Sequence, residues 1–162
     1  MPSRTPITVI IDDCGLVNTM FRHATTPQEK FVPAAFLRQF LEVAERYRIK
    51  GKFSLVPYPL CLGRIDQGIP GLPERDLREF LDLVQERIMP SWDLTPEILT
   101  HWWVWDLDNS VWIEERENDW SFRQSEETLT QYLCYALEIL VNAGFSPNGI
   151  TSPWDFGMQN EG

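Results

Sequence analysis

Three residues of this chain are the best suited to chemistry: Asp12, Asp13 and His101. The two aspartates end a β-branched run, residues 7–11, and are followed by a cysteine and a glycine. β-branched side chains favour a buried strand, and such a strand would not end on two unpaired carboxylates without a group to neutralise them. A divalent metal ion is one such group, and a histidine nitrogen is a suitable further ligand. We therefore take this strand end as the candidate site.

The chemistry expected of such a site is metal-assisted hydrolysis. A metal ion polarises a carbonyl group and lowers the pKa of a bound water, and a carboxylate accepts the proton of that water. Adjacent strand residues face opposite sides, so both aspartates reach one cavity only if the chain turns abruptly, which we expect at Cys14-Gly15. Oxygen from Asp106, Asp108 or Asp155 would complete a mixed ligand set that suits zinc, manganese or another first-row ion.

Each of these residues also has a purely structural interpretation. An Asp-Asp pair before Cys-Gly is often a solvated turn, and an isolated histidine is more often a hydrogen-bonded core or surface residue. Cys14 is not expected to act as a nucleophile, because two neighbouring carboxylates would raise the pKa of its thiol and no base is evident beside it. The tryptophans either stack on sugar rings or belong to the core or to subunit contacts: Trp102, Trp103, Trp105, Trp112 and Trp120.

The elements that must position these residues alternate along the chain. Apolar residues recur with helical period in some segments and gather in short runs in others, so that strands and helices follow one another in turn. This order predicts an α/β fold with a parallel sheet and right-handed crossovers, whose site lies beyond the carboxyl ends of the strands. The expected strands cover residues 7–11, 52–57, 96–104 and 149–155, and the expected helices cover 33–50, 73–89 and 125–142.

Composition narrows the class of protein. A chain of 162 residues with 43% hydrophobic content is expected to form a single domain with one core. A net charge of -10 opposes binding to nucleic acid or to an anionic membrane surface, and no apolar run approaches the roughly 20 residues of a membrane span. The N-terminus lacks the apolar centre of a signal peptide, which favours a cytoplasmic location. Three widely spaced cysteines suggest neither a disulfide framework nor a cysteine zinc site.

The motifs resemble those of the polysaccharide deacetylase family, metal-dependent carbohydrate esterases with a NodB-type distorted (β/α) barrel. Residues 12–15, Asp-Asp-Cys-Gly, are similar to the first family motif, Asp-Asp-Gly at a strand end, with one residue inserted. Residues 100–105, Thr-His-Trp-Trp-Val-Trp, resemble the second motif, in which two histidines four residues apart bind the metal. Residues 151–154, Thr-Ser-Pro-Trp, are similar to the third motif, Arg-x-Pro-aromatic, which shapes the substrate groove. Residues 51–71 are similar to diverged members of the family.

This resemblance implies that Asp12 is the general base and that Asp13 and His101 bind a divalent metal, with zinc as the expected ion. The implied function is hydrolysis of N-acyl or O-acyl groups of a carbohydrate. Trp105 stands where the second histidine belongs, and an indole has no lone pair for a metal, so the expected site is incomplete. The alternative is a non-catalytic member whose cleft binds a saccharide or packs against another subunit. The expected substrate-binding residues are Tyr58, Trp102, Trp105, Trp154 and Asp155.

The expected sheet has an open edge, because four parallel strands are too few to close a barrel. Either the NodB-like domain, residues 1–162, is incomplete at its C-terminus, or a second copy of the chain covers this edge as a homo-oligomer. The predicted partners are therefore a carbohydrate or acylated small molecule and a second copy, with no nucleic acid and no membrane.

Overall fold

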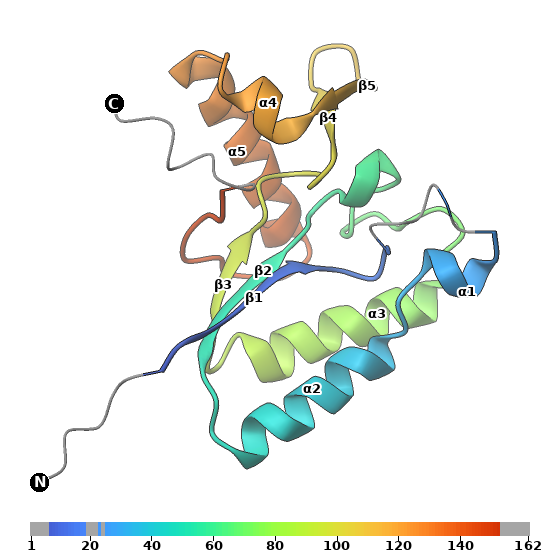
Figure 1. The fold of residues 1–162 in the computed structure, drawn as a ribbon, viewed down its shortest axis with the longest axis vertical. Helices are drawn as coiled ribbons and strands as arrows, with labels where there is room; N and C mark the ends of the chain where they lie inside the picture. Colours follow the sequence, from blue (N-terminus) through green and yellow to red (C-terminus); the bar gives the residue numbers. More distant parts are fainter. Residues whose placement is uncertain (1–6, 19–22, 24, 153–162) are drawn as a thin grey trace, which may run out of the picture.

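A small parallel sheet forms the centre of the molecule. The computed structural model describes residues 7–18, 23 and 25–152. The sheet has the order β1 (Val9–Cys14), β2 (Gly51–Leu55) and β3 (Asp93–Pro96), and both neighbouring pairs are parallel. Figure 1 shows two helices, α2 (Ala34–Arg46) and α3 (Glu74–Leu83), side by side against one face of this sheet. The fold is mixed α/β, as the alternating pattern predicts.

The helices on this face follow the predicted apolar stripes. The short α1 (Pro27–Lys30) precedes α2, and α3 continues as a π-helical turn, η3 (Val84–Ile88). α2 ends earlier than expected, because Arg48 adopts a left-handed conformation with φ of 53° and Ile49 N–H donates to the carbonyl of Ala44. Gly51 therefore lies beyond the helix end and belongs to the sheet. It begins β2, where an added Cβ would lie 1.7 Å from the Val9 carbonyl oxygen, so only glycine fits.

A hairpin and two helices form a second part of the fold. The expected strand 96–104 is wrong: β3 ends at Pro96, and an antiparallel hairpin of β4 (Trp103–Asp106) and β5 (Val111–Arg116) begins beyond a loop. α4 (Glu117–Ser121) and α5 (Glu126–Asn142) follow. The predicted start of α5 is confirmed, because the Ser125 hydroxyl accepts a hydrogen bond from Thr128 N–H at 3.2 Å.

The parallel sheet continues past β3 by a single residue. Thr151 forms a parallel bridge with Glu97, donating its N–H to the Pro96 carbonyl and accepting from Ile98 N–H. The rest of the expected fourth strand, residues 153–155, lies outside the described residues. Within the described part of the chain, β1 pairs only with β2 and no closed barrel forms. Among the residues that the structure describes, β1 is therefore an edge strand of a three-stranded sheet.

The two faces of the sheet differ in polarity. Phe53 and Leu55 on β2 are fully buried towards the core, whereas the alternate residues Lys52 and Ser54 face the other way. On this second face, Ser54, Thr95 and Thr151 form a buried group that we call the hydroxyl triad. The sheet thus has an apolar face towards α2 and α3 and a polar face opposite.

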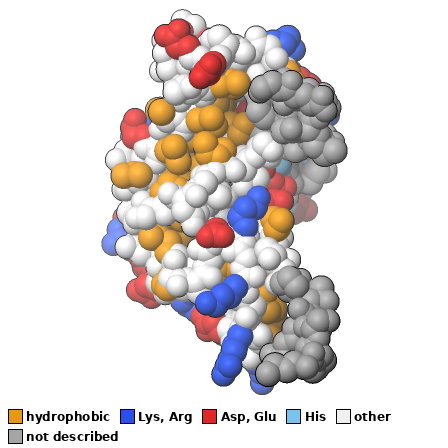
Figure 2. All heavy atoms as spheres, turned by 90° about the vertical axis from the view of Figure 1, so that its left-hand side faces the viewer, with side chains coloured by type: hydrophobic (Ala, Val, Ile, Leu, Met, Phe, Trp, Pro, Cys, Tyr) orange, Lys and Arg blue, Asp and Glu red, His pale blue; other side chains and the backbone are white. Residues whose placement is uncertain are grey.

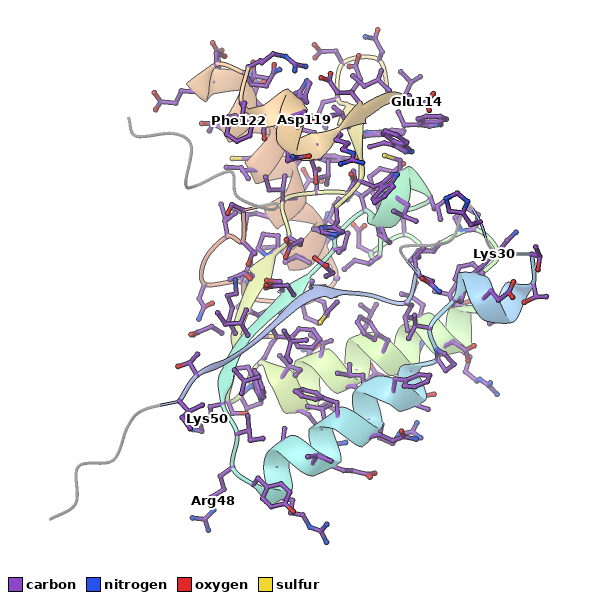
Figure 3. The ribbon with its side chains drawn as sticks, in the orientation of Figure 1. Lys30, Arg48, Lys50, Glu114, Asp119 and Phe122 are labelled. Carbon is purple, nitrogen blue, oxygen red and sulfur yellow. The ribbon has the colours of Figure 1, made fainter. Side chains whose placement is uncertain are left out.

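Charge and apolar surface are also unevenly placed. In Figure 3, Arg48 and Lys50 lie where the strands begin, whereas Glu114 and Asp119 lie at the other end of the molecule, in the hairpin and α4. On the face drawn in Figure 2, acidic and basic side chains are mixed in the lower half and hydrophobic side chains gather in the upper half. No helix within the described ranges is both long enough and apolar enough to cross a membrane.

Candidate functional site

A cavity of about 310 Å³ lies at the carboxyl ends of the parallel strands. Its lining residues are Asp12, Asp13, Glu97, His101 and Ser152. The structure therefore brings together the three residues singled out from the sequence, from β1 and from the loop after β3. It adds a third carboxylate, that of Glu97, which was not selected from the sequence.

A bulge in β1 lets both aspartates reach this cavity. The pairing of β1 with β2 shifts between Ile11 and Cys14, and Asp13 adopts φ of 57°, in the left-handed region. A bulge rotates successive side chains out of strict alternation, so two neighbouring residues can share one side. The change of direction thus occurs at the aspartates themselves and not at the expected Cys14-Gly15 turn.

Asp13, Glu97 and His101 form a cluster with the spacing of metal ligands. One ligand atom from each lies within 4.8 Å of the others. His101 Nδ1 is 3.2 Å from Asp13 Oδ1 and 3.8 Å from Glu97 Oε1. Among the described residues, neither His101 Nδ1 nor Glu97 Oε2 has a hydrogen-bond partner, although both atoms are buried. Buried polar atoms without partners are costly, and two carboxylates with one imidazole are a set that binds divalent ions. These residues fit a metal ion.

Glu97 has the most unusual electrostatic environment of the cluster. Its side chain is 3% exposed, and burial, followed by the charges of Asp13 and Asp12, raises its pKa to about 7. The sequence reasoning missed Glu97 because it placed the residue inside a strand. The available signal was an acid directly after the apolar strand end, four residues before His101.

Asp12 occupies a different environment from Asp13. Its Oδ1 accepts a hydrogen bond from the Ser54 hydroxyl at 3.1 Å and lies 3.4 Å from Lys52 Nζ. The Ser54 hydroxyl is in turn 3.1 Å from the Thr95 hydroxyl and 2.5 Å from the Thr151 hydroxyl. The hydroxyl triad therefore holds the Ser54 hydroxyl that donates to Asp12. One aspartate thus faces the cluster, and its neighbour is held by the polar face of the sheet.

A second buried carboxylate shapes the loop that carries His101. Glu117 is 2% exposed and accepts hydrogen bonds from the backbone N–H groups of Thr100 and His101 and from the Tyr132 hydroxyl, each at 2.9 Å. His101 has φ of 59° and Ile98 has φ of 35°, so the loop adopts a backbone that needs such support. Burial raises the pKa of Glu117 to about 7, against the opposing effect of these hydrogen bonds.

Among the described residues, the aromatic side chains expected to line the substrate cleft do not line the cavity around His101. Trp105 packs on Tyr58, with ring centroids 4.8 Å apart, and Trp102 packs on Trp103. Trp105 lines a separate cavity of about 210 Å³. The expected residues Trp154 and Asp155 lie outside the described part of the chain.

The remaining candidates have structural roles. Asp106 accepts hydrogen bonds from Asp108 N–H and from both the N–H and the side-chain amide of Asn109, which closes the β4–β5 turn. Neither Asp106 nor Asp108 lines the cavity around His101. Burial, followed by the charge of Asp13, raises the pKa of the Cys14 thiol well above its usual value, which agrees with an inert cysteine.

Comparisons with protein-family models, with curated proteins and with solved structures found no match to this chain. The site is therefore characterised by its own geometry, an acidic cavity with one histidine at the strand ends of a mixed α/β fold.

Proposed function

We propose that this protein is a metal-dependent hydrolase of polysaccharide-deacetylase type, which removes N-acyl or O-acyl groups from a carbohydrate. The observation that carries the proposal is the meeting of Asp12, Asp13 and His101 in one cavity with the buried Glu97, whose Oε2 has no hydrogen-bond partner among the described residues. The resemblance of the sequence motifs supplies the carbohydrate as substrate class and a NodB-type partial barrel as the architecture.

In this proposal Asp13, Glu97 and His101 hold the divalent ion, and Glu97 takes the place of the absent second histidine. Two oxygen ligands and one nitrogen ligand suit zinc, the expected ion, and also manganese or another first-row metal. A divalent ion held by these residues would supply Lewis-acid polarisation of the acyl carbonyl group and activation of a water.

Asp12 is the general base. The Ser54 hydroxyl and the Lys52 ammonium group orient its carboxylate at the edge of the cavity, 3.1 Å and 3.4 Å from Oδ1. Asp12 accepts a proton as water oxygen bonds to the acyl carbon. The bond from that carbon to nitrogen or oxygen then breaks, and the proton passes to the leaving amine or alcohol.

The test combines metal content with activity. We expect the purified protein, dialysed against zinc or manganese, to retain near-stoichiometric metal by elemental mass spectrometry and to hydrolyse acylated sugars. Asp12→Asn keeps the metal and loses about 10²–10⁴-fold in rate, as removal of a general base does. Asp13→Asn loses the metal, and Asp106→Asn, a matched control in the hairpin turn, changes neither. Absence of metal from the wild-type protein, or equal activity of wild type and Asp12→Asn, would overturn the proposal.

One observation favours a second candidate function, saccharide binding without catalysis. The cavity of about 210 Å³ beside the hairpin combines the aromatic residues Trp105 and Trp120 with polar Gln124 and Gln131. Aromatic faces with nearby amides can bind a neutral sugar. For this function, Trp105→Ala would abolish binding of an oligosaccharide and Asp12→Asn would leave it unchanged. A second copy of the chain that covers the open edge of the sheet is also part of this candidate.

A further inference from the structure

A second cavity adjoins the candidate site and is lined by different chemistry. It has a volume of about 350 Å³ and lies between β1 and α2. Asp12 and Asp13 line both this cavity and the one around His101, so both spaces border the β1 bulge. Beyond these two carboxylates the walls are mainly hydrocarbon, including Ile11, Phe36, Leu37, Phe40, Phe53 and Phe80.

We propose that this apolar cavity binds the hydrocarbon chain of the acyl group that the site removes, so that the substrate carries an acyl group several carbons longer than acetyl. The inference rests on the proposed function for the reaction and on the cavity for the chain length. The space between β1 and α2 is then the acyl-chain subsite.

Three features of the cavity select this occupant. Its volume lies in the range of about 300–1,000 Å³ that is typical of ligand sites. Away from Asp12, Asp13 and Asn18 its walls are mainly hydrocarbon, which favours an apolar chain over a sugar. Phe36 lines it with 63% of its surface exposed, so contact with a chain would remove apolar surface from water. Asp12 and Asp13, in a chain of net charge -10, disfavour a free fatty acid anion. A neutral amide or ester with an apolar acyl chain matches all three.

Gly15 provides a way to fill this cavity without disturbing the backbone. It lines the cavity, an added Cβ would meet no heavy atom within 4 Å, and its φ lies outside the left-handed region. Gly15→Trp therefore places an indole in the space assigned to the chain. Gly15→Ala is the matched control, because it makes the same backbone change and leaves most of the volume open.

A comparison of the affinities for octanamide and acetamide, which are both uncharged, tests the subsite without any need for turnover. We expect octanamide to bind the wild-type protein and Gly15→Ala at least about tenfold more tightly than acetamide, measured by titration with NMR detection. In Gly15→Trp this preference falls to near unity. Equal affinities for the two amides in the wild-type protein would overturn the proposal, even if Gly15→Trp failed to fold. So would a preference that survives in folded Gly15→Trp.

Hydrolysis of p-nitrophenyl esters separates the subsite from the reaction. Water oxygen adds to the acyl carbon, the bond to the p-nitrophenyl oxygen breaks, and a carboxylic acid and p-nitrophenol are released. A higher kcat/KM for the octanoate than for the acetate, lost in Gly15→Trp, supports the inference, and a preference for acetate overturns it. If neither ester is hydrolysed, the proposed function fails and the octanamide measurement alone decides the chain-binding subsite. If Gly15→Trp dissociates an oligomer by size-exclusion chromatography, the cavity is a subunit contact and the proposal is overturned.

Discussion

Two buried glutamates flank the His101 loop, and their surroundings are opposite. Glu117, on the hairpin side, accepts three hydrogen bonds at 2.9 Å from Thr100, His101 and Tyr132. Glu97, on the sheet side, is equally buried, yet its Oε2 has no partner among the described residues and two aspartates lie nearby. Burial raises the pKa of each glutamate to about 7.

The difference separates a scaffold from a site. A buried carboxylate whose oxygens accept donors from the backbone stabilises the chain around it, because it satisfies groups that water cannot reach. A buried carboxylate with an oxygen that lacks a donor, beside other acids, costs the folded chain free energy until a cation or proton binds there. We therefore expect Glu117 to stabilise the fold of the loop and Glu97 to interact with a bound ligand. Substitutions of these two residues should accordingly have different effects.

The largest expected effect is on the scaffold side. Glu117→Ala removes the acceptor of two backbone N–H groups and one hydroxyl, and each buried donor left without a partner costs about 1–3 kcal/mol, so unfolding in urea should show a loss of at least about 3 kcal/mol. Glu117→Gln retains one carbonyl oxygen and should lose less. A loss for Glu117→Ala no larger than that of an exposed substitution such as Glu114→Ala would refute the scaffold role.

Glu97 should behave in the opposite way. Glu97→Gln keeps the shape of the side chain and removes its charge beside Asp13 and Asp12, so the metal-free protein should be as stable as the wild type or more stable. Affinity for zinc or manganese should fall by roughly 100-fold, about 2.7 kcal/mol, measured by titration calorimetry. Metal affinity unchanged in Glu97→Gln would show that Asp13 and His101 bind the ion without it.

Some parts of the scaffold and of the site could be predicted from the sequence and others could not, for physical reasons. Helices α2, α3 and α5 follow from their apolar stripes, and the first strand and its two aspartates follow from the β-branched run. The hairpin was missed because its tryptophans read as the end of a buried strand, and the break depends on the Glu117 carboxylate, which binds the loop from 16 or 17 residues away. Contacts of this kind are not encoded in local periodicity.

Glu97 was missed for a related reason. A single acid after an apolar run carries no local sign of burial, and its role follows from where the loop after β3 meets the β1 bulge. The position given to Trp105, that of a second histidine, came from the resemblance to the second family motif. In the structure Trp105 belongs to β4 and packs against Tyr58. The acid pair at the end of β1 could be predicted from local sequence, whereas the place of Glu97 beside it depends on tertiary structure.

The pH dependence of stability offers a finer comparison. The pKa of Glu97 is about 7 in the folded chain against an ordinary value of 4.5, so between these values the folded state binds more protons than the unfolded state. Stability from this group is therefore fully present below pH 4.5 and is lost as pH rises through 7. For the chelator-treated protein, we expect urea unfolding to show a decline of roughly 1–2 kcal/mol across this window that is smaller in Glu97→Gln. Part of the slope remains in that variant, because the pKa of Glu117 is also raised. Identical slopes in the two proteins would mean that Glu97 is not the group that titrates.

The smallest effect is expected at Asp106. This acid is neither buried with several backbone donors, as Glu117 is, nor placed in the cavity around His101, as Glu97 is. Among the described residues, the partly exposed carboxylate of Asp106 accepts hydrogen bonds from Asp108 and Asn109 within its own turn, which lower its pKa. Asp106→Ala should therefore change urea unfolding far less than Glu117→Ala does, since a turn in contact with solvent can exchange these bonds for water. Metal affinity should stay within error of the wild type, because Asp106 does not line the cavity around His101. A marked loss of metal in Asp106→Ala would mean that the hairpin turn contributes to metal binding. The division between a scaffold role for Glu117 and a binding role for Glu97 would then not extend to the hairpin.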